Sequence, residues 1–150
     1  MVRLVIGIGN AWRSDDAAGL EVARALQNSP LEGVDVLARE GEPTELIDVW
    51  AGAEAVWLVD AVSSGATPGT VHRLDASSEP LPAVLFRVSS HLVGLAEAVE
   101  LARALDRLPP RVVVYGIEGA RFEAGEGLTP EVEVAVDLVV ARLRAEVAGP

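Results

Sequence analysis

Three short runs of almost uninterrupted apolar residues place the strongest constraint on how this chain can fold. They cover residues 2–8, 55–61 and 111–117, and they are rich in Val, Ile and Leu. Strands that are buried on both faces of a parallel sheet have this pattern. Residues 34–39 and 70–74 are shorter strand candidates. The sequence therefore predicts about five strands, and their spacing leaves room for a helix between most of them.

Helical patterns fill several of the intervening segments. Gly19, Val22, Ala23 and Leu26 recur at the spacing of one helical face, and Asp15 or Asp16 is expected to cap this helix. Further helices are predicted at about 44–51, at 91–107 with a buried stripe that reaches Leu105 or Asp106, and from Pro130 to about 147. Alternating strands and helices predict a three-layer α/β/α fold, mostly parallel, with helices on both faces. One domain is expected over residues 1–150.

The composition argues against several classes of protein. The 150 residues carry a net charge of −11, and the 12 basic residues are all Arg, scattered singly. Nucleic-acid binding needs clustered basic residues, so no nucleic-acid partner is expected. The lack of Cys excludes disulfides and a Cys nucleophile. No apolar run reaches the roughly 18 residues of a membrane span, and the first residues lack a signal-peptide pattern. We therefore expect a cytoplasmic protein without a membrane partner.

Two acidic residues and a His occupy the places where such a sheet binds ligands. Ligands lie at the carboxyl ends of parallel strands, and Asp16 and Asp60 follow the first and third long strands, while His91 opens a helix. Two carboxylates and an imidazole suit borderline divalent metals such as nickel or zinc. Capping roles for the acids and a surface role for His91 stay open, because the three are far apart in sequence. Glu40 and Glu42 are auxiliary candidates at a neighbouring strand end.

Other residues allow different interpretations. Gly7 and Gly9 follow a dinucleotide-binding pattern, but Trp12 replaces the third Gly and acids at the helix start would repel a pyrophosphate. These glycines are expected instead to permit a sharp turn and a close backbone approach. A Ser/His/Asp catalytic set lacks the usual Gly-x-Ser-x-Gly turn. His72 lies in a short strand between polar turns, and we interpret it as a surface residue whose replacement has little effect.

Six motifs lie in order along nearly the whole chain, at residues 7–19, 59–61, 68–70, 89–95, 114–118 and 127–130. Together they resemble the motifs of the hydrogenase maturation endopeptidases. The resemblance implies a five-stranded sheet between helices. It also implies an aspartic-type peptidase that removes the C-terminal extension of a nickel–iron hydrogenase large-subunit precursor after nickel insertion. The family's metal-contacting residues would fall on Asp16, Asp60 and His91. The first of these positions is often Glu in the family.

Three roles for these residues follow from the resemblance. Asp16 and Asp60 can share a proton and activate water, or all three residues can hold a metal that polarises the scissile carbonyl. We favour a third role, recognition of nickel carried by the substrate, because a carboxylate dyad needs no His; other divalent metals could occupy the same site. Alternatives are a non-catalytic nickel-sensing assembly module and a nucleotide-binding α/β protein. The family often has a glycine-rich turn where this chain has the acidic segment 40–44, which leaves the hydrogenase class open. The cleavage position and the oligomeric state are open as well.

Overall fold

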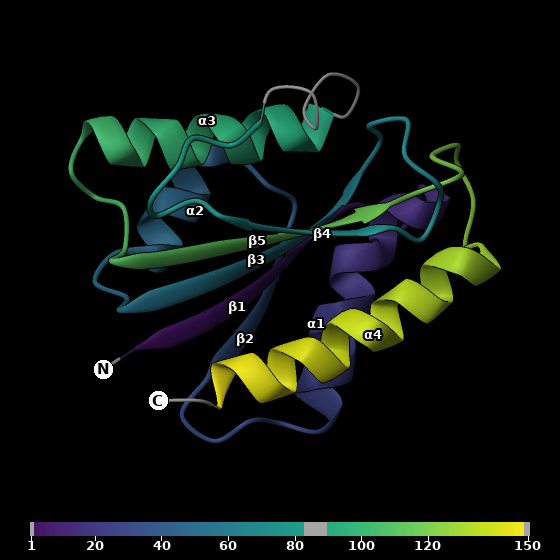
Figure 1. Cartoon of the computed structure of the whole chain (residues 1–150), viewed down its shortest axis with the longest axis horizontal. Coiled ribbons are helices and arrows are strands. Elements are labelled where there is room, and N and C mark those ends of the chain that lie inside the picture. Colours follow the sequence, from purple (N-terminus) through teal and green to yellow (C-terminus); the bar gives the residue numbers. More distant parts are fainter. Residues whose placement is uncertain (1, 83–89, 149–150) are drawn as a thin grey trace.

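Five strands, one 3-10 helix and four α-helices form the described part of the chain (Figure 1). The computed structural model describes residues 2–82 and 90–148, with only the backbone for residues 90–94. The strands are β1 (Arg3–Ile8), β2 (Asp35–Arg39), β3 (Ala55–Val62), β4 (Val71–Asp75) and β5 (Arg111–Glu118). The helices are η1 (Ser14–Ala17), α1 (Ala18–Asn28), α2 (Pro43–Trp50), α3 (Ser90–Ala104) and α4 (Pro130–Val147).

The strands form one sheet in the order β2-β1-β3-β5-β4. The first four of these run parallel, and β4 pairs antiparallel with β5 at one edge. The helices α2 and α3 cover one face of the sheet, and α1 and α4 cover the other (Figure 1). The predicted mostly parallel sheet between two helical layers is therefore confirmed.

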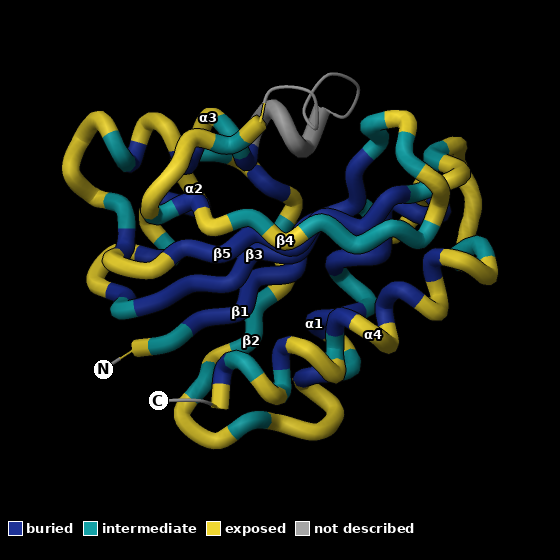
Figure 2. The backbone as a smooth tube through the Cα atoms, viewed as in Figure 1, coloured by how far each residue is buried: buried dark blue, intermediate teal, exposed yellow. Residues whose placement is uncertain are grey.

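Burial follows the strand order (Figure 2). β3 is buried along its whole length, and β1 and β5 are buried at every residue but the first, whereas the edge strands β2 and β4 are only partly covered. Side chains alternate between the two layers, so that Val56 and Leu58 pack toward α2 and α3, and Trp57 and Val59 pack toward α1 and α4. The apolar runs of the sequence are thus the three central strands.

The end of α3 differs from the prediction. The stripe formed by Leu95, Val99 and Ala102 is buried as expected, but Leu105 is 55% exposed. α3 ends at Ala104, because Asp106 adopts a left-handed φ of 58° that a continuing helix cannot accommodate. The turn therefore ends the helix before the Pro pair at 109–110 is reached.

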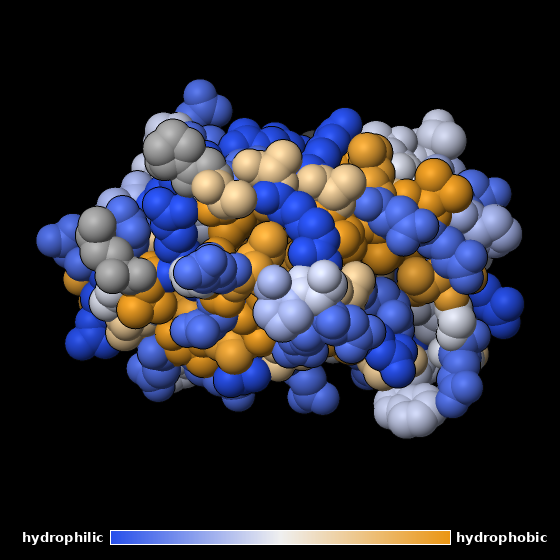
Figure 3. Space-filling view, turned by 90° about the horizontal axis from the view of Figure 1, so that it is seen from below, coloured by the Kyte–Doolittle hydropathy of each residue, from blue (hydrophilic) through white to orange (hydrophobic). Residues whose placement is uncertain are grey.

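The surface carries mixed chemistry. Figure 3 views the face covered by α1 and α4, where hydrophobic patches lie among hydrophilic side chains. Val134 and Leu138 on α4 are exposed apolar residues. Within residues 2–82 and 90–148, no helix combines the length and the hydropathy that crossing a membrane requires.

One ion cluster fastens α4 to the sheet through Glu146. Its carboxylate accepts hydrogen bonds from Nε1 of Trp57 at 2.6 Å, from the Tyr115 hydroxyl at 2.7 Å, and from two nitrogens of Arg73 at 3.0 and 2.9 Å. Arg111 lies 3.6 Å from the same carboxylate and stacks over the Trp57 ring. Burial alone would raise the pKa of Glu146, but the hydrogen bonds from Arg73, Tyr115 and Trp57 outweigh burial and lower it to about 2.

Glu146→Gln is expected to lower the free energy of unfolding at pH 7 more than at pH 3. The folded-state pKa lies below the ordinary value of 4.5, so the carboxylate stabilises the fold above pH 4.5 and loses that contribution as pH falls toward 2. After solvent screening, we expect a difference of about 1–2 kcal/mol at pH 7. Urea unfolding at both pH values measures it. Glu123→Gln, whose side chain is highly exposed, is the control; a pH-independent effect at Glu146 would contradict the prediction.

Candidate active site

The carboxyl ends of β1 and β3 bring two acidic residues into one region. Asp60 lies near the end of β3, and Asp16 lies in η1, which follows β1. β1 and β3 are paired neighbours, with Gly7 opposite Val59. The helix η1 also contacts β3 directly. The sequence prediction that both acids lie at this edge of the sheet agrees with these positions.

Asp60 is fully buried in the structure. By the alternation along β3, its side chain belongs to the face that α2 and α3 cover, as do those of Val56, Leu58 and Val62. Its Oδ1 accepts a hydrogen bond from the backbone N–H of Ala61 at 2.8 Å. A carboxylate buried at the end of an apolar strand is costly for a structural residue, which favours a functional role for Asp60.

Asp16 is also buried, and glycines set its position. A Cβ at Gly9 would lie 2.1 Å from the Asp16 carbonyl oxygen, and a Cβ at Gly19 would lie 2.3 Å from the carbonyl oxygen of Val59. The start of α1 therefore rests directly on the backbone next to Asp60. A Cβ at Gly7 would lie 2.1 Å from the Gly19 carbonyl oxygen, so the glycines serve close backbone approach, as predicted.

The expectation that Asp15 or Asp16 caps α1 is wrong. The N-cap residue of α1 is Ala17, which makes no side-chain capping bond, and both acids lie in η1. Asp15 instead binds a distant segment, because its carboxylate accepts hydrogen bonds from the backbone N–H groups of Ala120, Arg121 and Thr129 at 2.8–3.0 Å. The Thr129 hydroxyl donates to it as well. Asp15 thus connects the loop after β5 to the segment that carries Asp16.

Backbone pairing strengthens the same connection. Ser14, at a left-handed φ of 52°, donates its N–H to the Gly125 carbonyl, and Asp15 donates its N–H to the Arg121 carbonyl, both at 2.9 Å. A non-glycine residue in this conformation is uncommon and is held by its surroundings. The segment that carries Asp16 is therefore fixed from both sides, by the sheet and by the 119–129 loop.

His91 lies in the first turn of α3, but its side chain is outside the described part of the structure. α3 covers the face to which Asp60 belongs, and its N-terminal end lies toward the carboxyl ends of β3 and β5 (Figure 1). The position of the imidazole relative to the two carboxylates stays a prediction. Among the described residues, no three acidic or His side chains are close enough to hold a metal ion.

Glu40 and Glu42, the auxiliary candidates, have different surroundings. Glu42 caps α2, because its carboxylate accepts the backbone N–H groups of Thr44 and Glu45 at 3.0 and 2.8 Å. These bonds lower the pKa of Glu42, and its role is structural. Glu40 lines a groove of about 210 Å³ with residues 9–12, including Trp12, which is 67% exposed. The groove continues the carboxyl edge beyond β1.

The polar group at the end of β5 was assigned no role from the sequence. Glu118 is 1% exposed and accepts hydrogen bonds from the backbone N–H and the hydroxyl of Ser64, and from Nε2 of His72 at 3.0 Å. His72 is therefore not the simple surface residue that its local sequence suggested. Ser64 and His72 both bind Glu118, and no bond joins them to each other in the part of the chain described, so this is not the order of a Ser/His/acid triad.

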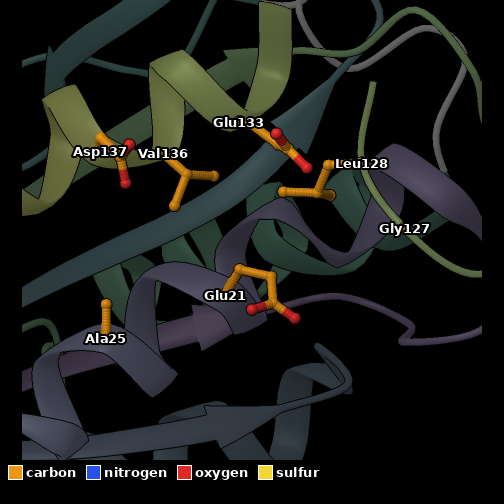
Figure 4. A pocket seen from close by; sticks show the side chains of 7 residues that line it. All are labelled: Glu21, Ala25, Gly127, Leu128, Glu133, Val136 and Asp137. Atoms are coloured by element: carbon orange, nitrogen blue, oxygen red, sulfur yellow. The ribbon is translucent and has the colours of Figure 1, made fainter. Parts of the chain in front are cut away.

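A larger pocket, of about 450 Å³, lies between α1 and α4 (Figure 4). Glu21, Glu133 and Asp137 point their carboxylates around apolar side chains there, and Glu21 forms an ion pair with Arg24 at 3.4 Å. Neither Asp16 nor Asp60 lines this pocket. This pocket therefore lies at a different place from the candidate site.

Comparisons with known proteins give one consistent result. Residues 20–146 match the family model described as Hydrogenase maturation protease. The chain is 31% identical to the Hydrogenase 2 maturation protease of Escherichia coli strain K12, over 94% of this chain and 90% of that protein. The structure resembles E. coli HybD, a hydrogenase maturating endopeptidase, with a TM-score of 0.78, 29% identity, and coverage of 97% and 94% of the two chains. HybD of Thermococcus kodakarensis, a [NiFe] hydrogenase maturation protease, gives a TM-score of 0.76 and 26% identity, with coverage of 99% and 100%.

Proposed function

The chain belongs to the hydrogenase maturation protease family, and from this premise we propose that it cuts the C-terminal extension from the large-subunit precursor of a nickel–iron hydrogenase. It is an endopeptidase of that family. We further propose that Asp16, Asp60 and His91 form the site that meets the nickel-bearing part of the precursor. The nickel belongs to the substrate in this proposal.

One observation carries the proposed site. Asp16 and Asp60 are both buried, on elements that contact each other, at the carboxyl edge of the sheet. Two buried carboxylates in one region are costly to the fold unless hydrogen bonds or a cation offset their charge. Two neighbouring carboxylates would attract a divalent cation carried by the precursor, and carboxylate oxygen with imidazole nitrogen is a suitable donor set for nickel.

These residues also suit peptide hydrolysis. A buried carboxylate can take a proton from the attacking water, and a carboxylic acid can return one to the leaving amine. Asp60 accepts the Ala61 N–H at Oδ1, and the segment that carries Asp16 is held by backbone hydrogen bonds to the 119–129 loop. Both carboxyl groups would take part in this proton transfer. His91 would complete the recognition of nickel, which makes cutting conditional on metal insertion.

The proposed function predicts cleavage that depends on nickel in the precursor. Incubating the protein with nickel-loaded and with nickel-free large-subunit precursor, followed by gel electrophoresis and mass spectrometry, measures the loss of a C-terminal segment. We expect cutting of the loaded form and little of the free form. Equal cutting of both would contradict nickel recognition, and binding without cutting would indicate a non-catalytic assembly module.

A further inference from the structure

The sheet register places His72 beside the candidate site. Asp60 on β3 is opposite Gly116 on β5, and Gly116 is opposite His72 on β4. Residues in register project on the same face, so Asp60 and His72 emerge on the side that α2 and α3 cover. Two strand spacings separate their backbones, which is about 9–10 Å. The β5 residue between them, Gly116, has no side chain.

Glycine at this position leaves room for the Val62 side chain, which lies close to the backbone of β5. A Cβ at Gly116 would lie 2.8 Å from Cγ1 of Val62 and 3.7 Å from Cβ of His72. A larger residue would push against Val62, whereas its distance to His72 would be that of an ordinary contact. The surface between Asp60 and His72 is therefore limited by Val62 rather than by a side chain of β5.

Glu118 holds the His72 ring in one orientation. A carboxylate accepts hydrogen bonds and does not donate, so the Nε2 atom at 3.0 Å from Glu118 must carry the proton. The Ser64 N–H, at 3.2 Å, and the Ser64 hydroxyl donate to the same carboxylate and fix it in turn. An apolar residue at this buried strand end would stabilise the fold at lower cost than a carboxylate. The observed arrangement is that of an acid that orients an imidazole.

The hydrogen bond between Nε2 of His72 and Glu118 also sets the role of the other ring nitrogen, Nδ1. The His72 side chain is 24% exposed, and among the described residues its only hydrogen bond is through Nε2. A neutral ring with hydrogen on Nε2 presents an acceptor at Nδ1, which suits a peptide N–H. An extended peptide rises about 3.3 Å per residue, so 9–10 Å corresponds to about three residues. A peptide anchored at Asp60 would therefore reach His72 about three residues away.

We propose that His72 is a substrate-binding residue that accepts a hydrogen bond from the main chain of the precursor near the cleaved bond, and that Glu118 is its positioning residue. The proposal rests on the proposed function, because the bound peptide is the precursor itself. It assigns to this edge of the sheet a second contact, separate from the three residues that meet the nickel.

Cleavage kinetics of His72→Gln on nickel-loaded large-subunit precursor test this proposal. The Gln amide N–H can still donate to Glu118, but the variant has no ring acceptor in place of Nδ1. We expect KM to rise about threefold to tenfold with kcat within about twofold, as for the loss of one binding hydrogen bond. Thermal unfolding should match that of the wild type. Asp75→Asn, at the other end of β4, is the control and should behave as the wild type in both measurements.

The outcomes separate this proposal from the proposed function. If the wild type cuts and His72→Gln has the wild-type KM, His72 only supports Glu118, and the inference is overturned while the proposed function stands. If the wild type does not cut, the proposed function fails, and calorimetric binding of the same precursor decides the inference. Weaker binding by His72→Gln would support it. Equal binding, or no binding by the wild type, would overturn it.

Discussion

Asp16→Asn, Asp60→Asn and His91→Ala are each expected to slow cleavage of nickel-loaded precursor by roughly 100-fold or more. Each Asn keeps the size of the Asp side chain but removes the charge that would meet the nickel and the group that would take a proton from water. His91→Ala removes the only imidazole expected to contact the metal. A gel assay that follows initial rates measures all three variants.

The stability of these variants separates a functional role from a structural one. Both Asp residues are buried, so the loss of either charge bears on the fold as well as on activity. Asp→Asn removes a buried charge without leaving a cavity, and we expect the free energy of unfolding to change by less than about 1 kcal/mol. Asp35→Asn, at the amino end of β2, is a matched control on the opposite edge of the sheet and should retain full activity.

His91→Ala also distinguishes the two mechanisms. If Asp16 and Asp60 act as a carboxylate dyad, the variant should retain substantial cleavage, since the imidazole takes no part in that chemistry. If the site instead recognises nickel in the precursor through His91, the variant should lose cleavage. Full activity in all three variants would mean that the carboxyl edge of the sheet is not the active site, although the family and the fold would stand.

The fold was predictable because burial dominates its sequence pattern. A strand buried on both faces must be apolar throughout, so β1, β3 and β5 are visible as apolar runs without any knowledge of their neighbours. The same logic exposes Asp60, since a charge at the end of such a run is unusual. Asp16 is identified by its position after β1. Local sequence and strand order were sufficient to place these two residues at the carboxyl edge of the sheet, and their roles stay a prediction.

The remaining polar network was not predictable, because it depends on contacts between distant segments. Asp15 has the sequence of a helix cap, and only the return of the 119–129 loop gives its carboxylate four donor groups. His72 is polar among polar neighbours, and only the antiparallel register of β4 places it against Glu118. The one available signal was Glu118 itself, an acid at the end of a buried, mostly apolar strand.

The second large effect is expected at Gly19, where α1 meets the sheet. A Cβ there would lie 2.3 Å from the Val59 carbonyl oxygen and 2.5 Å from that of Ile8, and real Cβ contacts are never this short. Both atoms belong to buried backbone of paired strands, so neither can move without breaking the sheet. In an isolated helix Ala is favoured over Gly by about 1 kcal/mol. Here steric overlap should dominate, and we expect Gly19→Ala to lower stability by about 2–3 kcal/mol.

Gly19→Ala should also reduce activity more than its stability loss explains. The added methyl group must push the start of α1, and with it η1, away from β3, which separates Asp16 from Asp60. Misplacement of a reacting group by about 1 Å can cost roughly 100-fold in rate. Urea unfolding and initial cleavage rates, measured at a temperature where the variant is fully folded, test both effects.

Gly52→Ala is the control, since a Cβ there meets no atom within 4 Å and only the left-handed φ of 78° is strained. That variant should lose about 1 kcal/mol of stability and no activity. Wild-type stability and rate in Gly19→Ala would show that α1 can move without disturbing the two carboxylates. The close approach of α1 to β3 would then not be the feature that positions Asp16.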